Sequence, residues 1–358
     1  MNRRNFLSTA ALASAGLALA ATPIQAANAS PLLDALGKRI PLGMDNFAVR
    51  AWGWKGRELV DYAAGLHLNT LFITDLAGIG ALTLTAASEL KKYADDKNIA
   101  LLLGSWSICP TSKSFKKEWG TAEEHLALGL KLSRAAGSPV FRVVLGSRED
   151  RKTPGGIEAR ILDTVRVLKA CRHMAMDLGV KVSVENHAGD MTADELVWLV
   201  ESAGREYVGV NMDSGNSAWT FEDPLESLEK LGPYTLTTSL RDSRIWATDK
   251  GCKVQWTAVG DGGCVDQKRY FARFAQLCPG VAVNIETIGG FAVEFPYHEE
   301  GFWDAFPKKS AAEFARFLSV VRRGTEMDTY DGNNKDRQRS ELEKSLRYCR
   351  DELGLGLA

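Results

Sequence analysis

Eight short apolar segments, each followed by a longer helical pattern, recur between residues 40 and 323. Segments such as 141–145 and 208–212 have the nearly continuous apolar pattern of strands that are buried on both faces. The strict alternation of strand and helix predicts a parallel sheet. The predicted strands are 40–44, 70–74, 100–104, 140–145, 181–185, 208–213, 236–240 and 281–286.

The predicted helices complete a repeating unit of one strand and one helix. Thr121 with Glu124, and Thr192 with Glu195, have the spacing of capping boxes at helix starts. Eight units are the number in a closed (β/α)₈ barrel, which we expect as a single domain. An open doubly wound sheet is the alternative, but no glycine-rich phosphate loop follows the first strand. The helices are expected near 56–66, 83–97, 121–136, 156–178, 192–203, 224–231, 266–277 and 310–323.

Residues 1–29 are expected to lie outside this fold. The pair Arg3 and Arg4 is followed by an alanine-rich apolar stretch at 10–21, which resembles a twin-arginine export signal. The stretch is shorter than the roughly 20 residues of a membrane span. Cleavage after Ala29 would release a periplasmic or secreted protein with no stable membrane insertion; an uncleaved anchor is the alternative. Such a protein meets unphosphorylated sugars more readily than sugar phosphates.

The C-terminal segment differs in character from the rest of the chain. Residues 325–358 follow the expected barrel domain, 30–324, and 335–352 are dense in charge with a thin apolar stripe. This spacing predicts an amphipathic helical extension, laid on the barrel or on a partner subunit of a homo-oligomer. A solvated tail is the alternative. The stripe consists of Leu342, Leu346, Cys349 and Leu353.

The charge balance bears on the class of partner. The chain has 44 Lys and Arg against 45 Asp and Glu, a formal net charge of -1. Phosphate binding by a basic face needs clustered cations. We therefore expect no nucleic-acid partner.

Acidic residues end three of the predicted strands. Glu185, Asp213 and Glu286 follow strands five, six and eight, and the carboxyl ends of barrel strands meet at one mouth. Buried carboxylates without counter-charges repel one another and are costly to desolvate. A divalent cation such as Mg²⁺ or Mn²⁺ would neutralise them. The alternative is that each acid pairs with its own arginine or caps its own loop.

The order of these motifs resembles a known family. The chain reads Glu-Asn-His-x-Gly from Glu185, Asp-x-Gly-Asn from Asp213, Leu-Arg-Asp at 240–242, and then the strand-final Glu286. This order is similar to that of the xylose isomerase-like TIM barrel family of sugar isomerases and epimerases. In that family the first Glu, the Asp, a strand-seven His and the last Glu bind a divalent metal. The resemblance implies Mn, Mg, Co or Zn bound by Glu185, Asp213 and Glu286.

The fourth metal ligand of the family is missing here. The strand-seven position that usually holds His is Ser239. Three explanations are open. Ser239 or water fills the position, another histidine such as His187 or His298 reaches in, or the site has lost its metal and binds sugar only.

The resemblance also implies a mechanism. One Glu removes a proton beside a carbonyl, the metal stabilises the enediolate, and a second Glu returns a proton. Glu185 and Glu286 are the candidate catalytic pair. A related lyase or hydratase would use the same enediolate for β-elimination on keto-sugars or keto-glycosides. A non-catalytic sugar-binding barrel is a further alternative.

Several side chains near the strand ends are candidates for binding a small carbohydrate. Trp52 and Trp106 follow strands one and three, and aromatic rings combine apolar faces with a polar edge that suits a sugar. Some of the tryptophans that follow strands are alternatively expected only to close the top of the barrel. The polar candidates are His187, Asn216, Arg142 and Arg241.

Overall fold

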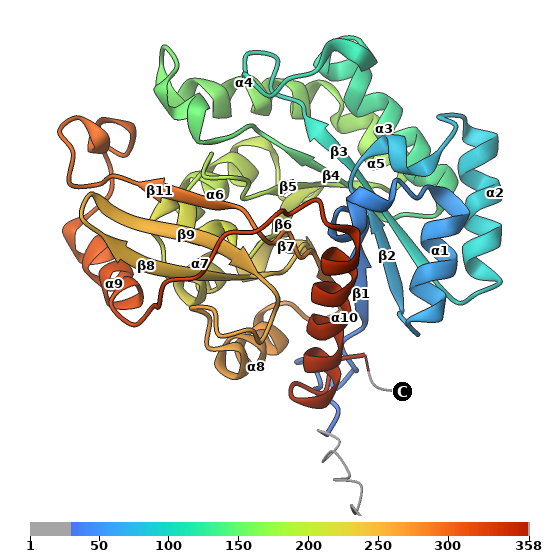
Figure 1. Cartoon of the computed structure of the whole chain (residues 1–358). Coiled ribbons are helices and arrows are strands. Elements are labelled where there is room, and N and C mark those ends of the chain that lie inside the picture. The colour runs from blue at the N-terminus through green and yellow to red at the C-terminus, as the bar shows by residue number, and fades with distance from the viewer. Residues whose placement is uncertain (1–29, 357–358) are drawn as a thin grey trace, which may run out of the picture.

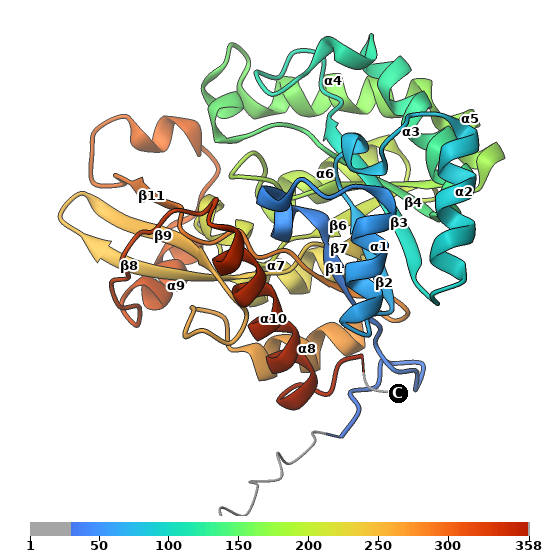
Figure 2. The same ribbon diagram turned by 45° about the vertical axis from the view of Figure 1, so that its right-hand side comes forward.

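The computed structural model describes residues 30–356, and the expected export signal at 1–29 lies outside the described residues. Eight parallel strands form one sheet in the order β10-β1-β2-β3-β4-β5-β6-β7 (Figures 1 and 2). A parallel bridge between Leu240 and Ile285 joins the two ends of this sheet. The predicted (β/α)₈ barrel is confirmed. Its strands are β1 (Leu42–Asp45), β2 (Thr70–Ile73), β3 (Ala100–Ser107), β4 (Val140–Val144), β5 (Lys181–Glu185), β6 (Val208–Met212), β7 (Thr235–Thr238) and β10 (Val283–Ile285).

Helices follow the strands as the sequence predicts. Both capping boxes form, because Thr121 accepts from the Glu124 N–H and Thr192 accepts from the Glu195 N–H. The helix expected at 156–178 is divided in two. The helices that follow β1 to β7 are α1 (Gly56–Gly65), α2 (Leu84–Asp95), α3 (Ala122–Ala136), α4 (Gly156–Ala170), α5 (Arg172–Leu178), α6 (Ala193–Ala203), α7 (Pro224–Leu231) and α8 (Gln267–Leu277). Short 3₁₀ helices η1 (Asn46–Trp52), η2 (Leu76–Ile79), η3 (Lys117–Trp119), η4 (Arg148–Lys152), η5 (Asn216–Thr220), η6 (Gly232–Tyr234) and η7 (Phe302–Ala305) lie in the connections.

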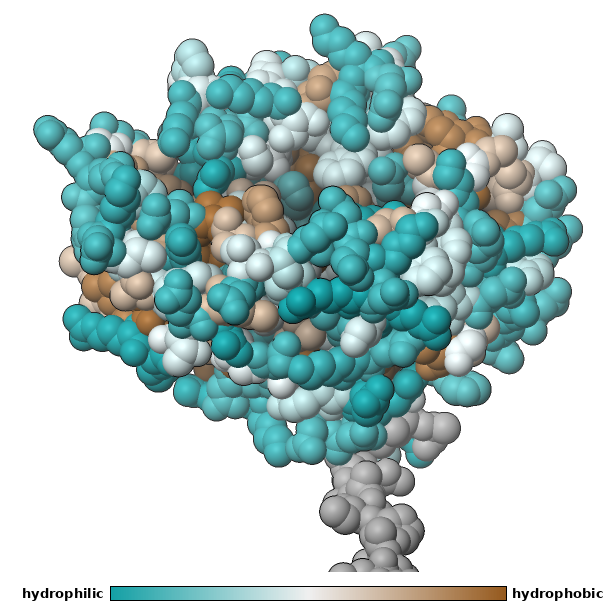
Figure 3. Space-filling model, in the orientation of Figure 1, coloured by the Kyte–Doolittle hydropathy of each residue, from teal (hydrophilic) through white to brown (hydrophobic). Residues whose placement is uncertain are grey.

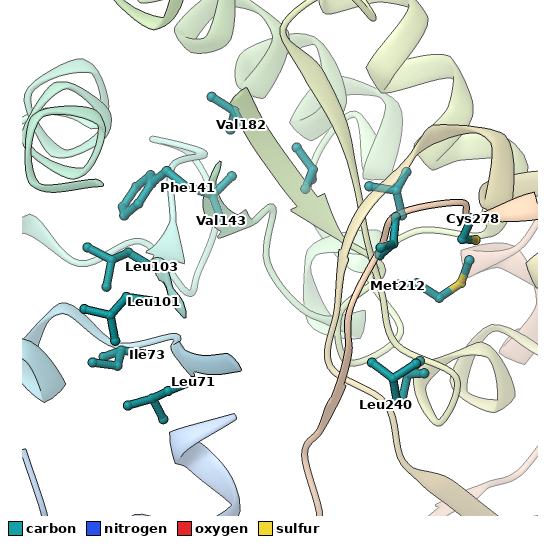
Figure 4. Close-up of a cluster of buried hydrophobic side chains, with 14 of the residues drawn as sticks. Leu71, Ile73, Leu101, Leu103, Phe141, Val143, Val182, Met212, Leu240 and Cys278 are labelled. Carbon is teal, nitrogen blue, oxygen red and sulfur yellow. The ribbon is translucent and has the colours of Figure 1, made fainter. Parts of the chain in front are cut away.

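The two faces of the barrel strands differ in polarity. Alternate residues such as Leu101, Leu103 and Phe141 belong to the main apolar core (Figure 4). Gly129 on α3 makes room for one of them, since a Cβ there would lie 2.0 Å from Phe141 Cζ. The residues between them include many polar side chains. Thr70 Oγ1, for example, donates to Asn284 Oδ1 at 2.7 Å within the barrel.

A second, antiparallel sheet flanks the barrel and was not expected from the sequence. Its order is β11-β9-β8, with strands β8 (Asp242–Thr248), β9 (Gly251–Thr257) and β11 (Ala292–Phe295) (Figure 1). Helix α9 (Ala311–Val321) packs on it through Phe317 and Val320, which share an apolar cluster with Ile245 and Val254. The expected helix at 310–323 therefore exists, but it covers the second sheet instead of the barrel.

Helix α10 (Lys335–Asp351) packs on the barrel, which is one of the placements that its apolar stripe allowed. It lies between α1 and α8 (Figures 1 and 2): Tyr62 Oη of α1 donates to Glu343 Oε1 at 3.3 Å, and Lys268 Nζ of α8 lies 3.3 Å from Glu352 Oε2. The C-terminal segment thus supplies the helix that completes the ring around the strands.

The surface is mostly hydrophilic on the face shown in Figure 3, with hydrophobic side chains gathered in patches. Within residues 30–356, no helix combines the length and the apolar character that crossing a bilayer requires.

Candidate active site

Three carboxylates meet at the carboxyl-terminal mouth of the barrel. Glu185 ends β5, Asp213 follows β6, and Glu286 follows β10. One oxygen from each lies within 4.8 Å of the others, and all three side chains are buried. The structure thus brings together the acids that the sequence places at strand ends.

Glu185 forms an ion pair with Arg142 of β4. Its Oε2 accepts from Arg142 Nε at 2.7 Å and from Asn211 Nδ2 at 2.7 Å, while Arg142 Nη1 donates to the Ser105 carbonyl at 2.9 Å. Its Oε1 is buried and has no hydrogen-bond partner among the described residues. Burial alone would raise the pKa of Glu185, but the Arg142 guanidinium lowers it below its ordinary value. Glu185 is therefore a carboxylate with one free oxygen.

Arg241 is shared by the other two acids. Its Nη2 contacts both Asp213 Oδ2 and Glu286 Oε2, and its Nε donates to Asp213 Oδ1 at 3.2 Å. Burial raises the pKa of Asp213 to about 6 and that of Glu286 well above its usual range, although Arg241 opposes both shifts. One guanidinium does not fully compensate two buried carboxylates.

Asn216 forms a hydrogen bond with Asp213 and does not line the cavity described below. Its Nδ2 donates to Asp213 Oδ2 at 2.6 Å, and the Gly215 N–H donates to Asp213 Oδ1 at 2.8 Å. The expectation that Asn216 binds substrate is therefore corrected: its amide orients an acid of the site.

Ser239 occupies the strand-seven position inside the barrel and is fully buried. Its hydroxyl donates to Asp45 Oδ2 at 3.0 Å and accepts from Asn211 Nδ2 at 3.2 Å. Burial raises the pKa of Asp45 to about 6. Ser239 thus connects a fourth buried acid to the same network.

His298 is not a ligand of this site. It is exposed near the turn between β8 and β9, where its Nδ1 lies 3.2 Å from the Asp249 carbonyl oxygen. The expectation that His298 reaches the acids is wrong, because the second sheet carries its loop away from the mouth.

A cavity of about 260 Å³ borders Glu185 and Glu286, whereas Asp213 is not part of its lining. This volume is close to the lower end of the range of small-molecule sites, about 300–1,000 Å³. Two surface grooves of about 380 and 420 Å³ are larger, but neither borders the three acids. The cavity is lined by Phe47, Arg50, Thr74, Trp106, Arg142, Glu185, His187, Arg241, Trp256, Glu286, Ile288 and Phe291.

His187 lines this cavity. Its Nδ1 lies 2.7 Å from the Gly146 carbonyl oxygen. A carbonyl only accepts, so this contact assigns the proton to Nδ1 and leaves Nε2 as the acceptor. Burial lowers the pKa of His187, although Glu185 opposes the shift. The imidazole is therefore a neutral acceptor beside the acids.

Only one of the two tryptophans that were predicted to bind sugar lines the cavity. Trp106 lines the cavity with its Nε1 donating to Asp75 Oδ2 at 3.0 Å. Trp52 does not line it: the ring packs on Trp54 at 4.7 Å between centroids and its Nε1 donates to the Lys335 carbonyl at 3.2 Å. Contrary to the expectation that Trp52 binds sugar, its side chain contacts α10 and lies outside the cavity lining.

Trp256 is one of the tryptophans near strand ends that the sequence offered for a sugar pocket, whereas Phe291, Asp45 and Asn211 were missed. Trp256 and Phe291 form a wall that the second sheet and its neighbouring loop supply. Asp45 and Asn211 lie in the polar network beneath the acids. Asn211 carried a usable signal, because a lone amide in the apolar strand Val-Gly-Val-Asn-Met needs a buried partner.

The donor set fits a divalent cation. The site holds four buried carboxylates against three guanidinium groups, two of them buried and one half-buried in the cavity wall, which leaves an excess of one negative charge when all are ionised. The carboxylates are Asp45, Glu185, Asp213 and Glu286, and the guanidinium groups are Arg142, Arg241 and the half-buried Arg50. The unpartnered Glu185 Oε1 is a further donor. Hard cations prefer such oxygen ligands.

The comparisons with known proteins agree with this architecture. A xylose isomerase domain protein from Planctomyces limnophilus has 17% sequence identity and a TM-score of 0.52, covering 81% of this chain and 93% of that one. D-psicose 3-epimerase in the presence of D-fructose has 15% identity and a TM-score of 0.59, covering 88% and 100%. The IOLI protein with a binding zinc atom has 15% identity and a TM-score of 0.56, covering 80% and 100%.

At these identities the solved structures show a shared fold. No curated protein has a significant sequence match to the chain. A family model described as xylose isomerase-like TIM barrel matches residues 48–294, more than half of the chain. The chain therefore belongs to the xylose isomerase-like TIM barrel family.

Proposed function

We propose that the protein is an enzyme that isomerises or epimerises a carbohydrate by moving a proton on the carbon beside a carbonyl group. The observation that carries the proposal is the pair Glu185 and Glu286, which reach one cavity from β5 and β10 in different electrostatic surroundings. Two acids whose pKa values are pushed apart can act as base and acid in one reaction.

Glu185 is suited to the role of base. Arg142 and Asn211 occupy its Oε2, so Oε1, which has two lone pairs, is the oxygen that can contact a cation and accept a proton from substrate. Glu286 reaches the same cavity from β10 and is suited to returning the proton on the other side of the substrate; burial raises its pKa as long as no cation is bound. In the reverse direction the two residues exchange roles.

A divalent cation bound by Glu185, Asp213 and Glu286 would polarise the carbonyl and stabilise the enediolate. The similar structures support a cation and a sugar here, because the IOLI protein has a binding zinc atom and the D-psicose 3-epimerase structure is in the presence of D-fructose. The substrate would lie between the aromatic side chains Trp106 and Trp256 and above the charged groups.

Solvent isotope exchange tests the proposal. The wild-type protein is incubated in D₂O with Mn²⁺ and a panel of unphosphorylated keto-sugars, with sugar phosphates for comparison, and followed by proton NMR. We expect deuterium on the carbon beside the carbonyl together with a second sugar of the same composition. Elemental analysis of the purified protein measures the metal that it carries.

Other outcomes assign other functions. Exchange with an unsaturated product indicates β-elimination, the reaction of a lyase. Sugar binding without exchange indicates a non-catalytic barrel. Neither exchange nor binding across the panel contradicts the proposal.

A further inference from the structure

Arg241 contacts two of the three carboxylates that the proposed cation would use. Its Nη2 touches both Asp213 Oδ2 and Glu286 Oε2. We infer that Arg241 is an internal competitor of the divalent cation, so that guanidinium and cation bind these two carboxylates in turn. The inference rests on the proposed function and adds a control of cation affinity to it.

The competition follows from the atoms involved. A cation needs the oxygen lone pairs at about 2.0–2.6 Å. The N–H groups of Arg241 are directed at oxygens of the same carboxylates, with Nε also donating to Asp213 Oδ1 at 3.2 Å. A divalent ion between Asp213 and Glu286 would additionally repel the adjacent guanidinium, strongly so in a site shielded from water. The cation therefore binds after Arg241 has moved off these oxygens.

The structure provides a second partner for the arginine. Arg241 Cζ lies 4.4 Å from the centroid of the Trp256 ring, within the range of a cation–π interaction. Its Nη1 is buried and has no hydrogen-bond partner in the described part of the chain. A guanidinium released by the carboxylates keeps the indole face and needs only a local rotation.

Gly215 indicates that the chain is built around this side chain. Its φ of −75° suits any residue, so the backbone does not require glycine there. A Cβ at this position would lie 2.4 Å from Arg241 Cγ and 3.1 Å from Trp256 Cδ1. The missing side chain therefore leaves the space that the aliphatic part of Arg241 occupies beside Trp256.

Arg142 differs and is not a competitor. It binds Glu185 through Oε2 alone and leaves Oε1 without a partner. A cation can therefore use Glu185 while its ion pair stays intact.

Cation binding to full-length, chelator-treated protein tests the inference. Isothermal titration with Mn²⁺ compares wild type with Arg241→Gln, Arg241→Lys and the control Arg244→Gln. The control removes a nearby arginine on β8 whose Nη2 donates to the Asp261 carbonyl at 2.8 Å. We expect roughly ten- to a hundredfold tighter binding for Arg241→Gln, the size of effect that groups contacting metal ligands commonly have. The Mn²⁺ affinity of Arg241→Lys should lie between those of wild type and Arg241→Gln, and the affinity of Arg244→Gln should match that of wild type.

Equal or weaker Mn²⁺ binding by Arg241→Gln would overturn the inference, since Arg241 would then only orient the acids. Circular dichroism checks the fold, and if the Gln variant does not fold, tighter binding by Arg241→Lys decides the question. If wild type and folded variants all fail to bind Mn²⁺, competition is also overturned. The proposed proton transfer is judged separately, by solvent exchange in wild-type protein.

Discussion

The two arginines at the mouth of the barrel differ in how many acids each one serves. Arg142 pairs with one carboxylate, Glu185, and its remaining donor reaches the Ser105 carbonyl. Arg241 is shared by Asp213 and Glu286, and its Nη1 has no partner among residues 30–356. One side of the site is a balanced ion pair, whereas the other carries more negative charge than its arginine compensates.

This difference assigns separate roles to the two sides. A balanced pair holds Glu185 ionised and in one position. The unbalanced side gains most from an added cation, because its acids have raised pKa values and its arginine has the Trp256 ring as a second partner. In the proposed reaction, the base Glu185 would therefore be fixed on one side of the site, and the side that adapts to a cation would be the other.

The largest expected effect is on catalysis. Replacing Glu185 or Glu286 by Gln keeps shape and hydrogen bonding but removes the proton-transferring group, so solvent exchange should slow by about 10²–10⁴-fold. The matched control is Glu222→Gln, a buried Glu whose carboxylate accepts from Thr220 Oγ1 at 2.8 Å outside the cavity. Full exchange by Glu286→Gln would contradict the two-acid mechanism and make His187 the next candidate.

The second largest expected effect is a difference between Arg142 and Arg241 in how much each contributes to the free energy of unfolding. Arg142→Met removes the group that keeps Glu185 ionised, so Glu185 must either stay charged without a counter-charge or take up a proton that it does not hold in the wild type; breaking such a buried pair typically costs about 3–5 kcal/mol. Arg241→Met should cost less, because the raised pKa of Glu286 lets that acid take up a proton instead. Urea unfolding at pH 7 measures both values. Equal losses would show that the two arginines stabilise their buried acids equally.

The sequence predicted those features that depend on local pattern. Strand periodicity identified the eight barrel strands, and the position of acids at strand ends placed Glu185, Asp213 and Glu286 together. The resemblance further identified Arg241 as a site residue. It did not reveal that one guanidinium serves two acids, since this depends on side-chain geometry.

Features that depend on the path of the chain could not be predicted. The apolar stripe of α9 predicts a helix, but periodicity does not say which sheet covers the stripe. Trp52 and Trp256 both lie near strand ends, yet only Trp256 faces the cavity, because the second sheet carries it there. His125 lies in the first turn of α3, where the helix pattern favours a surface position, yet it is fully buried with its Nε2 2.7 Å from Ser105 Oγ.

The pH dependence of stability should reveal the excess negative charge. Burial raises the pKa of Asp45 from 3.8 to about 6, so the folded state holds its proton more tightly than the unfolded state does. Its contribution to stability is therefore complete below pH 3.8 and is lost as pH rises through about 6, a difference of roughly 3 kcal/mol. Asp45→Asn, which keeps an acceptor for the Phe47 N–H, should remove this part of the slope in denaturant titrations between pH 4 and 7. If Asp45→Asn leaves the pH dependence of the free energy of unfolding unchanged, ionisation of Asp45 does not destabilise the folded state.

The smallest expected effect concerns the strand-seven position. Ser239→His places an imidazole where a hydroxyl now binds Asp45 and Asn211. Imidazole suits Zn²⁺ while Mg²⁺ prefers oxygen. We therefore expect Zn²⁺ affinity to rise by about tenfold, comparable with other changes around metal ligands, and Mg²⁺ affinity to change little. Isothermal titration measures both, and Ser319→His on α9 controls for an added histidine elsewhere.

The selectivity of this change sharpens the comparison between the two sides. A gain for Zn²⁺ alone would show that the imidazole joins the three acids as a ligand, and that the natural Ser239 keeps the site rich in oxygen ligands. Unchanged Zn²⁺ affinity in a folded variant would show that the network of Asp45 and Asn211 holds the new side chain away from the cation. In that case the missing histidine would not limit the affinity, and competition by Arg241 would be the remaining control on it.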